Sequence, residues 1–152
     1  MLSKDDVIFA VKEFLLRRGW RVLAYRSPGG HGGLLVRPSS GTHAGRQFTL
    51  DLVVTKAGIT ICAEAKPRAN LRDKDKLDLL FGDPECRQAL QTAVDHLVAS
   101  EDEVCRPMTV VKGLAYCAGA LMPDDYVVLR ATEDAGVQCH LGPSLAWISE
   151  TL

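Results

Sequence analysis

The sequence predicts an α/β fold with the order helix, three strands, helix and further strands. Two short apolar runs, residues 50–54 and 59–65, flank a turn signal at Lys56-Ala57-Gly58, which is typical of a β-hairpin. Residues 3–18 before them have helical periodicity, and a second helical pattern over residues 85–100 precedes an apolar strand at 108–117.

The first helix is the most clearly patterned element. Ser3, followed by Asp6 three residues later, resembles a capping box, and Gly19 is a stop signal. The residues of its apolar stripe are Val7, Ile8, Val11, Phe14 and Leu15. The spacing of these residues predicts a helix with one face packed on a sheet.

A strand over residues 20–25 should follow, and a glycine-rich basic stretch comes next. Residues 26–30 end the strand, and residues 34–36 are a candidate short strand within the stretch 29–47. Two interpretations of this stretch remain open. It is either a basic loop that follows a nucleic-acid backbone or a long hairpin excursion.

The second half of the sequence predicts one more helix and an antiparallel β-hairpin at the edge of the sheet. The mixed-charge run 68–76 reads as a solvated turn or a helix start, and Pro84 heads the helix 85–100. The predicted stripe of that helix is Leu90, Val94, Leu97 and Val98. Residues 126–131 and 136–140 should form an edge hairpin, and residues 144–152 a short helix that packs Trp147.

Composition indicates one domain over residues 1–152. Hydrophobic residues make up 47% of the chain and charged residues 24%, as in ordinary globular proteins. An acidic start and the lack of a long apolar stretch predict a cytoplasmic protein with no membrane segment. The five cysteines, at positions 62, 86, 105, 117 and 139, form no C-x-x-C pair, which argues against a zinc cluster or a disulfide framework.

Charge is divided unevenly along the chain. Residues 1–76 contain 14 Lys and Arg against 7 Asp and Glu, whereas residues 77–152 contain 4 against 12. A basic first half suits a phosphodiester substrate. The split also fits two faces of a soluble domain or a self-complementary dimer surface.

The end of the predicted hairpin gathers charged side chains. Glu64 and Lys66 share one strand face while Ala65 faces the other, and Pro67 keeps Lys66 extended. A tight hairpin returns Asp51 beside Glu64. Two such carboxylates repel unless they share a proton or a cation, which points to a divalent metal.

Asp51 and Glu64-Ala65-Lys66, with the acids thirteen positions apart, resemble the Asp…Glu-x-Lys motif of the PD-(D/E)XK nuclease superfamily. Leu50 stands where the nominal proline of that motif would be. The resemblance implies a restriction-endonuclease-like core, in which helices flank a central mixed β-sheet in the order α-β-β-β-α-β, with a C-terminal β extension. It also implies a metal-dependent endonuclease that hydrolyses DNA phosphodiester bonds in repair, recombination or restriction.

The same resemblance assigns roles to the motif. Asp51, Glu64 and the carbonyl of Ala65 would hold Mg²⁺, with Mn²⁺ as a possible substitute, and Lys66 would serve the attacking water. For Lys66 we favour positioning and charge stabilisation over a role as general base. Related nucleases add an acid from the first helix, which would be Glu13 in preference to Asp6, although both also fit as solvated helix acids.

Further likenesses are looser. The first thirty residues are similar to the opening of archaeal Holliday-junction resolvases. RecB-like nucleases carry a glutamine on the helix equivalent to 85–100, and Gln88 and Gln91 are the candidates here, without the tyrosine that follows in that branch. Predicted nucleic-acid contacts are Arg26, Ser27, His31, Arg37, Arg46, Arg68 and Arg72.

Two alternatives to a DNA-cutting enzyme remain. The chain would be a catalytically silent nucleic-acid-binding module on the same fold, or a protein-interaction subunit that docks a partner through its acidic second half. A homodimer is expected if both strands of a duplex are cut.

Overall fold

The computed structural model describes residues 1–99, 109–134 and 136–152. Residue 100 at the end of the predicted second helix, residue 108 at the start of the predicted apolar strand, and Cys105 lie outside the described residues. The elements are α1 (Lys4–Arg17), β1 (Arg21–Tyr25), β2 (Leu34–Val36), β3 (Phe48–Leu50), β4 (Leu52–Lys56), β5 (Ile59–Arg68), α2 (Leu71–Gly82), α3 (Pro84–Ala99), β6 (Thr109–Ala118), β7 (Tyr126–Ala131), β8 (Val137–Leu141) and the 3₁₀ helix η1 (Pro143–Ile148).

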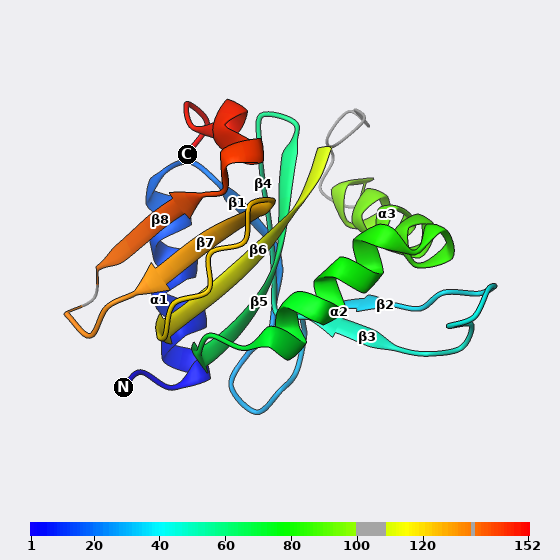
Figure 1. The fold of residues 1–152 in the computed structure, drawn as a ribbon, viewed down its shortest axis with the longest axis horizontal. Helices are drawn as coiled ribbons and strands as arrows, with labels where there is room; N and C mark the ends of the chain where they lie inside the picture. The colour runs from blue at the N-terminus through cyan, green and yellow to red at the C-terminus, as the bar shows by residue number, and fades with distance from the viewer. Residues whose placement is uncertain (100–108, 135) are drawn as a thin grey trace.

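Six of the strands form one mixed sheet in the order β1-β4-β5-β6-β7-β8 (Figure 1). β5, β6 and β7 run parallel to one another, and the remaining neighbours in this sheet are antiparallel. The prediction of an α/β fold with a mixed sheet between helices is therefore confirmed.

The predicted order of elements was wrong. The helix between the hairpin and the next strand is two helices, α2 and α3, joined at Asp83. Two further strands precede the hairpin: β2, at the candidate position 34–36, and β3, which was not predicted. The mixed-charge run belongs to α2 because Asn70 caps a new helix there, accepting a hydrogen bond from the Arg72 amide at 2.7 Å. A dense run of charges hid that cap signal.

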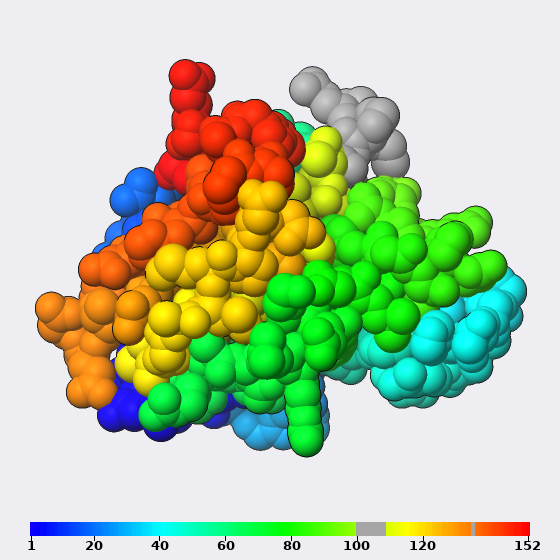
Figure 2. Space-filling model, viewed as in Figure 1, coloured from blue at the N-terminus to red at the C-terminus, as the bar shows by residue number. Residues whose placement is uncertain are grey.

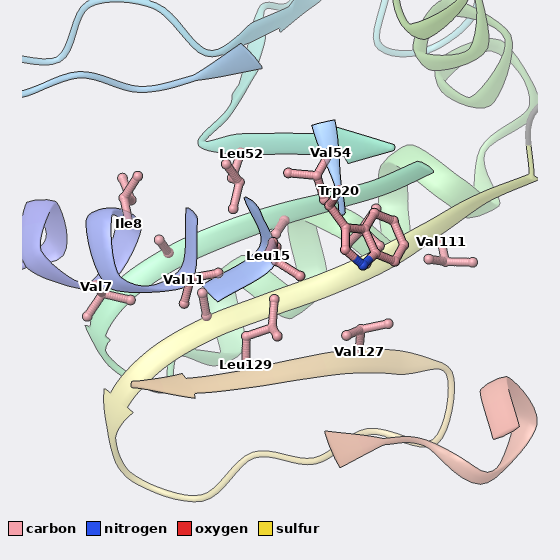
Figure 3. Close-up of a cluster of buried hydrophobic side chains, with 14 of the residues drawn as sticks. Val7, Ile8, Val11, Leu15, Trp20, Leu52, Val54, Val111, Val127 and Leu129 are labelled. Carbon is pink, nitrogen blue, oxygen red and sulfur yellow. The ribbon is translucent and has the colours of Figure 1, made fainter. Parts of the chain in front are cut away.

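Each face of the sheet carries its own core. α1 covers one face, where its buried residues Val7, Val11 and Leu15 point toward strand residues such as Leu52 and Leu129 (Figure 3). The helix begins where predicted, because Ser3 and Asp6 form a capping box. α2 and α3 cover the other face and bury a second cluster that includes Leu80 and Leu90.

β2 and β3 form a separate two-stranded ribbon, and we call residues 34–50 the arm. It projects beside α3 at the edge of the molecule (Figure 1), and Figure 2 shows it lying along the surface of the two helices. The stretch that allowed two interpretations thus contains a hairpin, and its contact with a nucleic-acid backbone stays a prediction. One residue, Asp51, separates β3 of the arm from β4 of the main sheet.

The chain's end differs from the prediction in one packing detail. Residues 143–148 form a 3₁₀ helix that buries Leu145 and Ile148, whereas Trp147 is 56% exposed. The prediction that Trp147 packs was wrong because the short helix turns its neighbours inward. Among the described residues, no helix has the length and apolar character needed to cross a membrane.

Candidate carboxylate site

The site is built at one end of the β4–β5 hairpin. The turn is two residues long, Ala57 (φ 52°) and Gly58 (φ 80°), and both adopt the left-handed conformation that a type I′ turn requires. This turn fixes the register, which pairs Leu52 with Ala63. Asp51 therefore lies opposite Glu64 as the hairpin ends, as the sequence predicted.

Asp51 and Glu64 are buried, at 0% and 3% exposure. The backbone N–H of Ala65 donates to Asp51 Oδ2 at 2.9 Å. Since the N–H and C=O of one strand residue point to the same neighbour, the Ala65 carbonyl lies on the Asp51 side of β5. Ala65 itself packs its methyl group into the core under α1, so Glu64 and Lys66 face the other side of the sheet.

Basic side chains surround the pair. Lys4, from the first turn of α1, places Nζ 3.0 Å from Asp51 Oδ1, and an Arg26 guanidinium nitrogen lies 4.0 Å from the same oxygen. Lys76, from α2, forms an ion pair with Glu64 and donates to the carbonyl of Thr49 at 2.6 Å. α1, α2, the arm and the hairpin all meet here.

Two buried oxygens of the pair nevertheless accept no hydrogen bond from the described residues. They are Asp51 Oδ1 and Glu64 Oε1, the atoms that face the Lys4 and Lys76 ammonium groups. The two lysines therefore compensate the charge of these oxygens as ion pairs. Buried acceptors without donors are uncommon in proteins and require an explanation.

The pKa values of the two carboxyl groups are shifted in opposite directions. Burial raises the pKa of Glu64 to about 8, and its hydrogen bond to Asp51 and the Asp51 charge add to this shift against the opposing effect of Lys76. Burial also acts to raise the pKa of Asp51, but hydrogen bonds with Glu64 and the Ala65 amide, together with the positive charge of Lys4, hold it below its usual value. Of the two acids, Glu64 is therefore the one that binds a proton more readily when no cation is present.

A third acid, Asp73 from the first turn of α2, stands nearby. Burial raises its pKa, and among neighbouring charges Lys66 opposes that shift most, while Asp51 reinforces it. Asp73 thus lies within electrostatic range of both Lys66 and the carboxylate pair. In the described parts of the chain, no three His, Cys, Asp or Glu side chains are grouped closely enough to hold a metal by themselves.

The structure does not bring the predicted helix acid to the pair. Glu13 lies nine residues beyond Lys4, about 13 Å farther along α1 at 1.5 Å per residue. Asp6 is exposed and its carboxylate caps the helix through the Ser3 amide. The α1 residue that reaches Asp51 is a lysine.

The other predicted residues are spread over five places. Arg26 is at the pair, and Ser27 Oγ donates to the carbonyl of His31 in the adjoining loop. Arg37 and Arg46 are exposed on the arm, and Arg68 and Arg72 are exposed where β5 leads into α2. On α3, Gln88 is exposed toward the arm, whereas Gln91 is hydrogen-bonded to Asp95.

Sequence reasoning missed Lys4, Lys76 and Asp73. Lys4 and Asp73 each lie in the first turn of a helix, beside an end of the sheet. Lys76 and Asp73 belong to the run 68–76, for which the sequence leaves a solvated turn or a helix start open. The available signal was the cap at Asn70, which turns that run into a helix with one side facing the hairpin.

Comparisons with known proteins found no match to any protein-family model, to any curated protein or to any solved structure. The likeness to PD-(D/E)XK nucleases therefore rests on the hairpin residues.

Proposed function

We propose that the chain is a metal-dependent endonuclease that hydrolyses DNA phosphodiester bonds at Asp51, Glu64 and Lys66. The observation that carries this proposal is the pair of buried carboxylates that face each other across the end of the β4–β5 hairpin. Burying two like charges side by side is costly, and a bound divalent cation would offset that cost.

The residues present fit a hard divalent cation. Asp51 Oδ1 and Glu64 Oε1 are buried oxygens that accept no hydrogen bond within the described chain, and the Ala65 carbonyl lies on the same side of β5. Carboxylate and carbonyl oxygens are the ligands that Mg²⁺ and Mn²⁺ take, with water completing the shell. The three oxygens would therefore hold one such ion.

The bound ion would supply Lewis-acid polarisation of the scissile phosphate. The chain's own residues supply the rest. Lys66 lies on the same strand face as Glu64 and within electrostatic range of Asp73, which fits it to orient an attacking water and to stabilise charge that develops on the phosphate. Arg26, beside Asp51, is the second cation available to a phosphate oxygen.

A nuclease assay on linear, branched and single-stranded DNA tests the proposal. The expected result is cleavage that needs Mg²⁺ or Mn²⁺, stops in EDTA, and is lost in Asp51→Asn, Glu64→Gln and Lys66→Ala variants that keep the wild-type circular dichroism spectrum. Asp75→Asn, an exposed acid on α2, is the matched control and should cut normally. Unchanged cleavage in the three site variants would overturn the proposal.

A specific observation favours a second candidate, a catalytically silent nucleic-acid-binding module. Lys4 and Lys76 already place ammonium groups against the two carboxylate oxygens. If these ion pairs persist in solution, they replace the metal. This candidate expects salt-sensitive DNA binding with no cleavage under any divalent ion, and no metal binding by calorimetry.

A further inference from the structure

A groove runs between the arm and α3, outside the carboxylate site. Its volume is about 590 Å³, and it is lined by β2 and the residues after it on one side and by one face of α3 on the other. Figure 1 shows where these two elements lie in the fold. Leu34, Leu35, Ala89, Ala93 and Leu97 supply apolar lining. A volume of this size is within the range of specific ligand sites.

The groove extends along most of the helix. At the arm's tip, a Cβ on Gly41 would lie 2.9 Å from the Glu85 side chain, so the tip touches the first turn of α3. At the arm's base, Leu34 lines the groove together with Leu97, near the end of α3. Twelve residues of helix separate Glu85 from Leu97, which corresponds to about 18 Å at 1.5 Å per residue.

The polar residues of the groove are mostly uncharged or basic. Arg37, Gln88, Thr92 and His96 are all exposed, and Ser39 and Ser40 add hydroxyl groups. Residues 27–50, which include the whole arm, contain no Asp or Glu. Glu85, at the tip, is the one acid among the described groove residues.

We propose that this groove binds a single strand of nucleic acid and guides it to the carboxylate pair. The proposal rests on the proposed function for the identity of the pair. Hydroxyl, amide and guanidinium donors suit phosphate and base edges, and the apolar lining suits base faces. About 18 Å accommodates roughly five nucleotides at 3.4 Å each. The small volume of about 590 Å³ over this length favours one strand over a duplex.

The inner end of the groove is near the site along the arm, because the groove residue Leu34 pairs with Leu50 of β3. β3 ends at Leu50, directly before Asp51, and Lys76 joins the arm to the pair by bonding both Thr49 and Glu64. Glu85 repels phosphate at the tip, so the phosphates should lie between Arg37 and His96.

Binding is tested by fluorescence anisotropy in EDTA, using labelled single-stranded DNA, the same sequence as RNA, and the DNA duplex. Wild-type protein should bind the single strands more tightly than the duplex. The Arg37→Ala/His96→Ala variant should bind single strands about tenfold more weakly. Arg37→Ala alone should reduce the salt slope by about 0.7, as expected for one lost contact to a single strand.

Two further variants sharpen the result. Glu85→Gln should tighten single-strand binding because it removes a repulsive charge, whereas a basic peptide in the groove would be bound less tightly by the same variant. Arg17→Ala removes an exposed cation from α1 on the opposite face of the sheet and should change affinity less than twofold. Three results would each overturn the groove proposal: tighter binding of the duplex than of the single strands, no binding of nucleic acid, or an equal loss of single-strand affinity in Arg37→Ala and Arg17→Ala.

The outcome is separable from that of the nuclease proposal. Single-strand binding that depends on Arg37 and His96, without cleavage under Mg²⁺ or Mn²⁺, supports the groove and overturns the nuclease. Cleavage that is lost in Asp51→Asn, with affinity for single strands unchanged by the groove variants, supports the nuclease and overturns the groove.

Discussion

α2 contributes charged residues to two clusters that differ in how their carboxylate oxygens are hydrogen-bonded. Toward the hairpin it offers Lys76 to Glu64, in a pair of carboxylates with unbonded buried oxygens. Toward β6 and β7 it offers Asp78, whose carboxylate is 2.9 Å from Lys112 Nζ, 2.7 Å from Lys74 Nζ and 2.6 Å from the Tyr126 hydroxyl. Lys112 also pairs with Asp125.

The second cluster, which we call the Asp78 network, has donors for its acceptors and opposite charges in contact. Burial acts against ionisation of Asp78, but hydrogen bonds from Lys74, Tyr126 and Lys112 hold its pKa at about 2. Such a network stabilises the packing of α2 against the sheet. The carboxylate pair also has basic partners, but it brings two acids side by side and leaves Asp51 Oδ1 and Glu64 Oε1 without a hydrogen bond among the described residues, so it is the cluster that a ligand would complete.

The carboxylate site and the Asp78 network should differ most in their effect on catalysis. Lys66→Ala should slow Mg²⁺-dependent cleavage by roughly a hundredfold or more, since it removes a donor to the developing charge. Lys112→Met, in the Asp78 network, should leave the rate within a few-fold at temperatures where the variant is folded. Single-turnover rates on one DNA substrate measure both. A comparable loss in the two variants would mean that Lys66 acts only through stability.

The next contrast is in stability. Asp78→Ala should lower the free energy of unfolding by about 2 kcal/mol, because Lys112, only 12% exposed, loses one of its two acidic partners and the Tyr126 hydroxyl loses an acceptor. Asp75→Ala, one turn earlier and exposed, should change it by less than about 0.5 kcal/mol. Urea unfolding measures both variants. Equal effects would show that the network is no more than surface charge.

The two clusters should also respond to pH in opposite directions. The pKa of Glu64 is raised from 4.5 to about 8, so the stability it contributes is complete below pH 4.5 and is lost as pH rises toward 8, by at most about 1.4 kcal/mol per pH unit. Asp78, with its pKa lowered from 3.8 to about 2, loses its contribution only as pH falls through that range. Urea unfolding of Glu64→Gln between pH 5 and 8 should lack the wild-type decline, and retention of the decline would contradict the assignment.

The smallest contrast concerns metal affinity. Lys76→Met removes the ammonium group that competes for Glu64 and should tighten Mg²⁺ or Mn²⁺ binding about tenfold, or about 1.4 kcal/mol, by calorimetry. Lys74→Met, the corresponding change in the Asp78 network, should leave metal affinity unchanged. If neither the wild type nor Lys76→Met binds a divalent ion, the silent-module candidate is favoured.

The hairpin was predictable because its signals are local. The turn at Ala57-Gly58 fixes the register, and the register alone places Asp51 opposite Glu64. Strand alternation then separates Glu64 and Lys66 from Ala65. These three inferences needed no knowledge of distant segments.

The surroundings of the pair were not predictable in the same way. Lys4 and Lys76 reach it from helices that are far from it in sequence, and their positions depend on how α1 and α2 pack on the two faces of the sheet. The helical pattern of α1 showed which residues face the sheet, but not which turn meets its end. For that reason Glu13, although it is on the helix that contacts the pair, lies too far along the helix axis to reach Asp51.

The one-residue link at Asp51 has a mechanical consequence. Its carbonyl is held by the Arg26 amide at 2.8 Å and its carboxylate by the Ala65 amide at 2.9 Å, while the whole ribbon of β2 and β3 departs from its N-terminal side. On the β3 side of the ribbon, Asp51 is the whole connection to the main sheet, so a rotation of β3 relative to β4 changes the backbone torsions of this residue. The separation of the two acids is thereby coupled to whatever displaces the ribbon some distance away.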